Sequence, residues 1–254
     1  MHLKLTIAYD GTDFVGWQRQ LNGLSVQALI EDALAPLDGS PVVVHGAGRT
    51  DSGVHARGQV ASVTLHCDLT PDAVVRAVNS RLPLAVRVLS AQAVDADFHA
   101  RFDARGKTYR YQIWNAGVLD PFERHFVWHI PYPSLDVDAM ADAAQHLLGR
   151  HDFAAFQSAG RDVTTSIRTI LHSTVTARDI PGGGRLITYD VRGDGFLRYM
   201  VRSIVGSLVD VGRGYRPASW LGDVLTACER GRAGRTAPAS GLCLVSVEYE
   251  RPDL

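Results

Sequence analysis

The sequence predicts an α+β protein made of two ferredoxin-like (RRM-like) halves, each with strands and helices in a βαββαβ-type order. Three observations support this prediction. Strand-like and helix-like segments follow one another in that order over residues 1–94. A decorated version of the same order recurs after residue 106. The chain has 254 residues and 46% hydrophobic content, which suffices for two small cores. We expect the sheets side by side around a central cleft that receives a substrate.

The first half, residues 1–105, is expected to hold four strands and two helices. Alternating apolar residues predict its first strand. Ser25 is a typical N-cap for the apolar helical pattern that follows it, and Thr70 is another, with Pro71 at the first helical position. The expected elements, in order, are a strand at 3–9, a helix at 26–37, strands at 42–44 and 59–65, a helix at 71–78 and a strand at 85–94.

The second half, residues 106–254, shares this pattern but no sequence identity with the first. A glycine-rich turn at 181–184 separates two strand-like runs and predicts a long hairpin. We expect the remaining elements to be a strand at 107–114, a helix opened by Ser134, hairpin strands at 167–178 and 185–192, helices at 196–211 and 217–228, and a closing strand at 242–249.

Composition excludes some classes of protein. The formal net charge of −1 gives no support for nucleic acid, yet 24 of the 26 basic residues are arginines, whose planar fork suits phosphate. A GC-rich genome would produce the same excess. Three cysteines without a CxxC pair predict neither a disulfide framework nor a zinc ribbon. With no HExxH motif, signal peptide or long apolar run, we expect no metal, no membrane and a cytoplasmic location.

The segment 48–56 is the most informative part of the chain. It places Asp51 between Arg49 and Gly53, on a glycine-punctuated connection between two expected strands. A side chain on such a connection can project into a cleft and act there. The same residue types also make ordinary surface turns.

The predicted helix at 196–211 is apolar nearly all round, which indicates a buried helix. It nevertheless carries Arg198 and Arg202, which four-residue spacing would place on one face. Breaking a buried ion pair costs roughly 3–5 kcal/mol, so an acid or a ligand phosphate should approach this helix. For Arg202 we favour a catalytic carboxylate. For Arg198 we favour a phosphate contact, a structural salt bridge or a side chain that reaches solvent.

Basic and aromatic residues interleave on the predicted strand at 107–114. Alternation places Lys107, Tyr109 and Tyr111 on one face and Arg110 on the other. An exposed aromatic face flanked by cations can stack on an unpaired base and hold its phosphate. A pair of tyrosines packed in a sheet core would give the same pattern.

Seven blocks of the chain, in order, resemble the tRNA pseudouridine synthase A family. They include the family's N-terminal signature at 9–20 and its catalytic loop at 47–56. A single block would be weak evidence, whereas seven in the family's order are specific. The other five blocks are 97–102, 107–111, 149–153, 195–202 and 237–242.

The resemblance implies a tRNA-modifying isomerase. It implies that Asp51 is the catalytic aspartate, that Arg202 is its ion-pair partner and that Tyr109 contacts the flipped uracil. Arg49 would extrude the nucleotide or hold its phosphate, and substrate contacts are also expected from Lys107, Arg110 and Arg198. The family converts uridine to pseudouridine in the anticodon stem-loop of tRNA (positions 38–40). It works as a homodimer, without cofactor or metal.

The chemistry suits these residues. The base must leave the stack at a cost of a few kcal/mol. An ionised carboxylate can then attack C1′ or add to uracil C6, and a nearby guanidinium favours its charged form. Three residues differ from those frequent in the family, namely Tyr199, Ser203 and Arg81. None of them removes a catalytic group.

Three alternatives remain open at this point. The first is a non-catalytic RNA-binding protein on the same scaffold, which would gain nothing from a carboxylate facing phosphates. The second is a glycosidase or hydrolase, which would usually need a second acid, whereas the loop offers only Asp51. The third is a pseudouridine synthase that modifies other RNA targets.

Overall fold

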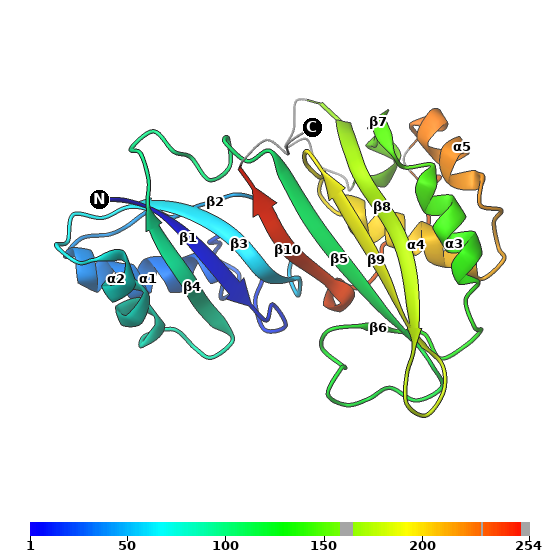
Figure 1. Ribbon diagram of the computed structural model, residues 1–254, viewed down its shortest axis with the longest axis horizontal. Helices are drawn as coiled ribbons and strands as arrows, with labels where there is room; N and C mark the ends of the chain where they lie inside the picture. Colours follow the sequence, from blue (N-terminus) through cyan, green and yellow to red (C-terminus); the bar gives the residue numbers. More distant parts are fainter. Residues whose placement is uncertain (158–164, 230, 250–254) are drawn as a thin grey trace. The chain divides into compact units, whose positions relative to one another are not determined.

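The computed structural model describes residues 1–157, 165–229 and 231–249 (Figure 1). The chain divides into two compact units. The first unit comprises Met1–Arg105 and Cys243–Leu254, and the second comprises Gly106–Leu242. Each unit has a mixed α+β fold, and the strands within each are mostly antiparallel.

The first unit is a small sheet covered by two helices. Strand β1 pairs antiparallel with both β3 and β4, β2 pairs antiparallel with β3, and β10 pairs parallel with the start of β3. Figure 1 shows α1 and α2 side by side on this sheet. Its elements are β1 (His2–Tyr9), α1 (Val26–Asp38), β2 (His45–Gly46), β3 (His55–Thr64), α2 (Pro71–Asn79), β4 (Val86–Ala93) and β10 (Leu242–Glu248).

Local sequence signals account for most of these elements. The apolar side chains of β1 alternate, and those of Leu3, Leu5 and Ile7 are fully buried. The Ser25 hydroxyl accepts a hydrogen bond from the Ala28 amide, so the predicted cap of α1 is confirmed. Thr70 caps α2 in the same way, with Pro71 at the first position.

The predicted strand at 42–44 is wrong. The backbone there is irregular, and the short strand β2 begins one residue later at His45. Side chains of α1 take the place of a neighbouring strand, because Val44 N–H donates to Glu31 and Val44 C=O accepts from Gln27. With its polar groups satisfied in this way, Val44 needs no strand partner.

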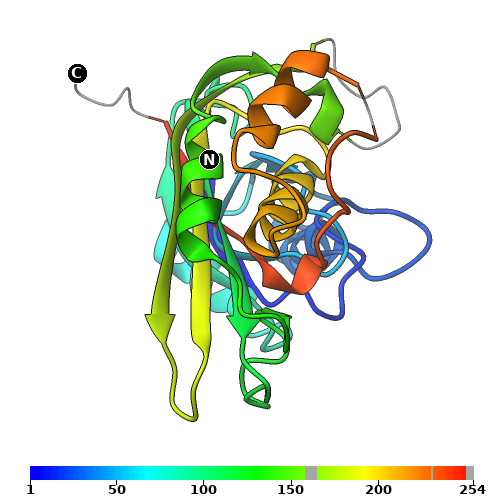
Figure 2. The same ribbon diagram turned by 90° about the vertical axis from the view of Figure 1, so that its right-hand side faces the viewer.

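The second unit is a sheet in the order β5-β9-β8-β7 with antiparallel neighbours, and β6 pairs parallel with β5. Figure 2 shows α4 and α5 on one side of this sheet. Its elements are β5 (Gly106–Asn115), β6 (Trp128–His129), α3 (Val137–Gln145), β7 (Gly149–Asp152), a 3-10 turn (Ala154–Phe156), β8 (Ile167–Asp179), β9 (Arg185–Gly193), α4 (Met200–Gly212), α5 (Trp220–Ala227) and a second 3-10 turn (Ala239–Gly241).

Helix starts in the second unit differ from those expected. Asp136 caps α3 by accepting from Ala139 N–H, so the helix does not open at Ser134. Helix α4 begins at Met200 and not at 196, because Tyr199 has a left-handed backbone with φ of 64° that no helix interior accommodates. The expected burial of α4 is confirmed, since Ile204, Val205 and Leu208 are fully buried.

The closing strand also differs from expectation. The sequence placed it with the second half, whereas β10 lies in the first unit, where Cys243 pairs with His55 and Leu244 with Ala56. Parallel pairing with a strand almost 200 residues earlier leaves no local sequence signal. Among the described residues, no helix is long and apolar enough to cross a bilayer.

Candidate active site

The loop that carries Asp51 connects β2 to β3. Asp51 is half-buried, Arg49 is exposed and Thr50 is buried. The Tyr9 hydroxyl lies 2.8 Å from Thr50 Oγ1, and burial raises the pKa of that phenol, which therefore stays protonated. Fully buried Gln59 donates from Nε2 to the Gly48 carbonyl at 2.9 Å. The two residues tied to strands of the sheet, Gly48 and Thr50, both lie just before Asp51.

A second loop, residues 10–17, holds the Asp51 loop from the other side. Trp17 N–H donates to the Thr50 carbonyl at 3.1 Å, and Gly53 N–H donates to the Phe14 carbonyl at 3.2 Å. Glycines permit this close approach, because a Cβ at Gly11 would lie 2.0 Å from the Val54 carbonyl oxygen. The N-terminal signature therefore supports the loop that bears the carboxylate.

Gly16 makes this support testable. Its φ is 108°, and a Cβ there would lie 2.5 Å from the Thr50 carbonyl oxygen. We expect Gly16→Ala to lower the free energy of unfolding by about 2–5 kcal/mol, from backbone strain and overpacking together. Urea denaturation measures this loss. Gly183→Ala is the matched control, because φ is 91° there but nothing lies within 4 Å of the added Cβ. Equal losses in the two variants would contradict the contact argument.

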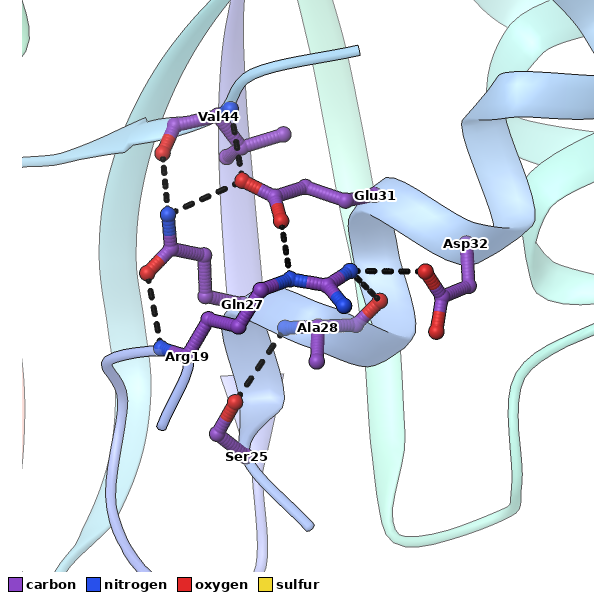
Figure 3. Close-up of polar contacts among 7 residues, drawn as sticks. All are labelled: Arg19, Ser25, Gln27, Ala28, Glu31, Asp32 and Val44. Carbon is purple, nitrogen blue, oxygen red and sulfur yellow. Dashed lines mark hydrogen bonds and ion pairs between the residues drawn. The ribbon is translucent and has the colours of Figure 1, made fainter. Parts of the chain in front are cut away.

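Arg19, two residues after the supporting loop, forms ion pairs with α1 (Figure 3). Its Nε donates to Glu31 at 2.7 Å, and a terminal nitrogen donates to Asp32 at 2.6 Å. The hydrogen bonds that it donates, first to Asp32 and then to Glu31, raise the pKa of the guanidinium. Buried Glu31 also accepts from Gln27 and from the amide of Val44. This network joins the loop, the helix and the segment that leads to β2.

The second unit supplies the predicted aromatic strand. Tyr109 on β5 is only 7% exposed, and its ring meets the Phe196 ring edge-on with centroids 5.1 Å apart. Tyr111 is fully buried and donates its hydroxyl to the Pro238 carbonyl at 2.8 Å. The expected exposed aromatic face is therefore wrong, because residues some 85–130 positions later cover both rings.

The two cations on β5 have different surroundings. Arg110 is exposed and makes a two-pronged ion pair with Asp190 across the β5–β9 ladder, with N–O distances of 2.8 and 3.0 Å. Its planar fork already faces a carboxylate, so a phosphate would compete with Asp190 for it. Lys107 is half-buried and lies opposite Gly193 in the same ladder.

Arg202 lies in the first turn of α4 and is half-buried. Its Nε donates to the Ala237 carbonyl at 2.7 Å, and Ala237 N–H returns a bond to the Arg202 carbonyl at 3.0 Å. Gly206 lets this segment lie on the helix, because a Cβ there would be 1.6 Å from the Arg235 carbonyl oxygen. The block at 237–242 therefore orients the Arg202 guanidinium.

Both Arg198 and Arg202 make cation–π contacts with the Tyr199 ring. The guanidinium carbon of Arg202 lies 4.9 Å from the ring centroid and that of Arg198 lies 5.1 Å from it. Arg198 is exposed and precedes α4, so the expectation that both arginines share one face of a helix is wrong. The strained backbone of Tyr199 is typical of a functional site.

The predicted site residues fall into two groups. Asp51 and Arg49 belong to the first unit. The second unit contains the other predicted residues, which are Lys107, Tyr109, Arg110, Arg198 and Arg202. Sequence reasoning missed the contacts of Phe196, Ala237 and the supporting glycines. Their only signal was membership of the motif blocks. Within the described residues, no group of three His, Cys, Asp or Glu side chains could hold a metal ion.

Comparisons with known proteins identify the family of this chain. A family described as tRNA pseudouridine synthase matches residues 5–103 and 143–250. The chain belongs to this family of isomerases.

Proteins named "tRNA pseudouridine synthase A" are similar to the chain over nearly all of its length. The one from Syntrophotalea carbinolica is 47% identical, and the match covers 99% of this chain and 97% of that protein. The one from Pelobacter propionicus is 48% identical over 97% of this chain and 99% of its own. A solved Cbf5-Nop10-Gar1 complex aligns at 13% identity and a TM-score of 0.36, covering 95% of this chain and 48% of the other.

Proposed function

We propose that this enzyme isomerises uridine to pseudouridine at positions 38–40 in the anticodon stem-loop of tRNA. The observation that carries the proposal is the identity of 47–48% with relatives named tRNA pseudouridine synthase A, over almost the whole chain. The Asp51 loop supports it, because two sheet strands and a second loop hold the residues on either side of this carboxylate.

Asp51 acts as the nucleophile in this proposal. Its carboxylate attacks C1′ of the flipped nucleotide while the N1–C1′ bond breaks and the electron pair passes to the uracil, or it first adds to C6. The detached uracil turns, and C5 forms the new bond to C1′ as Asp51 departs. The C5 proton is then removed and N1 is protonated. Atoms and charge balance without an added reactant.

The other residues bind and orient the substrate. The Arg202 charge keeps Asp51 ionised, since a nearby cation favours the charged form of a carboxylate. The Tyr109 ring covers the uracil face and excludes water, and its hydroxyl is the candidate base for the C5 proton. Arg49, Lys107 and Arg198 bind phosphates of the extruded strand, and Arg110 does so in competition with Asp190.

We propose the finer architecture on the same basis. The two units are ferredoxin-like halves, residues 1–105 and 106–242, with β10 completing the first. The enzyme acts in the cytoplasm as a homodimer in which each tRNA touches both subunits. A monomer in light scattering at working concentration would contradict the dimer.

The role of the Tyr109 hydroxyl leads to a prediction. Tyr109→Phe keeps the ring and its edge-on contact with Phe196 but has no base. We expect pseudouridine formation to slow by about 10²–10⁴-fold, the usual contribution of general acid–base catalysis. Release of tritium from tRNA labelled at uridine C5 measures the step. Near-normal release would leave Tyr109 with a covering role alone.

The function itself is tested with purified protein and an unmodified tRNA transcript, without added metal or cofactor. Carbodiimide treatment followed by primer extension maps pseudouridine. We expect modification at positions 38–40 only. Pseudouridine elsewhere in the tRNA would support a synthase with other targets. Binding without any product would support a non-catalytic RNA-binding protein.

A further inference from the structure

A turn in the first unit presents an aromatic ring to solvent. Phe102 is 71% exposed. It lies in the motif block 97–102, which has no place in the proposed chemistry. Its ring lies 4.3 Å from the His99 ring at an interplanar angle of 34°, and His99 in turn lies 5.3 Å from the exposed ring of His45. We call His45, His99 and Phe102, with Arg101, the aromatic platform.

Hydrogen bonds fix the platform in advance. His99 N–H donates to the Asp103 carboxylate at 2.7 Å, and Asp103 N–H donates to the His99 carbonyl at 3.1 Å, which closes the turn. The amides of Arg101 and Phe102 both donate to His99 Nδ1, at 3.1 and 3.4 Å. Because the backbone of the turn is fixed in this way, a ligand that stacks on the Phe102 ring does not have to order it.

The turn is also anchored to the sheet. Ala100 N–H donates to the Ser62 hydroxyl at 3.2 Å, and the Ala100 carbonyl accepts from the Tyr249 hydroxyl at 2.7 Å. Burial raises the pKa of Tyr249, so this donor stays protonated. Ala100 packs with Ala47 and Val60 in one buried cluster. The platform therefore adjoins the start of the loop that carries Asp51.

A guanidinium group lies beside the exposed ring. The Arg101 guanidinium carbon lies 5.8 Å from the Phe102 ring centroid, and exposed Arg105 ends the turn. Of the three acids in the same stretch, Asp103 accepts a hydrogen bond from His99, and Asp95 and Asp97 are exposed. An exposed aromatic face beside guanidinium groups matches the requirements of an unpaired base and its phosphate.

We propose that the aromatic platform is a second RNA-binding site, in which an unpaired base of the tRNA stacks on Phe102 while Arg101 binds its phosphate. The proposal rests on tRNA being the substrate. It adds a contact outside the nucleotide that reacts, on a surface that the catalytic residues do not use.

Binding of an unmodified tRNA transcript to the Asp51→Asn protein tests the platform without turnover. In that background we expect Phe102→Ala and Phe102→Leu to weaken binding by roughly 5- to 150-fold, the range for one stacked base. Phe102→Tyr should restore it, because the tyrosine ring also stacks. We expect Arg101→Gln to reduce the slope of log K against log salt by about 0.7–0.9, as for one lost phosphate contact.

Phe122→Ala is the matched control, since it removes an 86% exposed phenylalanine of the second unit and should leave binding unchanged. Unchanged binding in all the Phe102 variants would overturn the proposal. So would normal binding with leucine but not alanine, or a change of oligomeric state in light scattering, since either result would indicate an apolar protein contact. Failure of the proposed function is separate, because it would appear as absence of pseudouridine with the wild-type protein.

Discussion

Replacing Asp51 by asparagine is expected to abolish pseudouridine formation while tRNA binding persists. The change keeps the shape of the side chain and removes the nucleophilic carboxylate. Loss of a covalent nucleophile costs up to about 10⁶-fold in kcat, so product should be undetectable. Single-turnover assays with excess enzyme measure the chemical step, and filter binding measures the affinity for tRNA.

The matched control is Asp68→Asn, which neutralises an exposed loop carboxylate of the same unit. It should leave the single-turnover rate unchanged. Because Asp51 itself is only half-buried, both variants should unfold at nearly the wild-type temperature. Product from the Asp51→Asn protein at more than about a hundredth of the wild-type rate would exclude Asp51 as nucleophile.

Removing the charge of Arg202 is the second large effect. We expect Arg202→Met to lower kcat by about 10²–10³-fold, the usual cost of one electrostatic contact to the reacting groups. Arg202→Lys should recover part of the rate, because it restores a cation but lacks the Nε donor that reaches the Ala237 carbonyl. The thermal midpoint of each variant shows how much of the loss comes from loosening that segment.

Arg198→Met provides the contrast. Arg198 lies over the same Tyr199 ring at nearly the same distance, yet it is exposed and precedes α4. As a phosphate-binding residue it should raise KM for tRNA by about 3- to 10-fold and change kcat little. If both arginine variants lowered kcat alike, the separate role of Arg202 would be wrong.

Short-range patterns determined much of this protein. Alternation in β1, the Ser25 and Thr70 caps and the glycine-rich turn of the β8–β9 hairpin each act within a few residues, so they are visible in a single sequence. The motif blocks likewise identified the family and pointed to Asp51, Arg202 and Tyr109 as site residues. Their roles remain predictions.

Other features depend on residues far apart in the chain. The tyrosines of β5 are buried by Phe196 and by the segment around Pro238, which alternation on one strand cannot show. Arg110 faces Asp190 only because β5 and β9 pair in that register. The start of α4 is set by the left-handed backbone of Tyr199, at a residue type that gives no warning of it.

The sequence by itself therefore determined the family and the order of strands and helices in the first unit, and it pointed to the residues that we propose carry the chemistry. The tertiary structure alone decided which side chains are covered, how Gly11 and Gly16 bring two loops together, and that β10 joins the first unit. The physical reason is range. Caps and periodicity follow from neighbouring residues, whereas burial and strand register follow from contacts between segments that folding brings together.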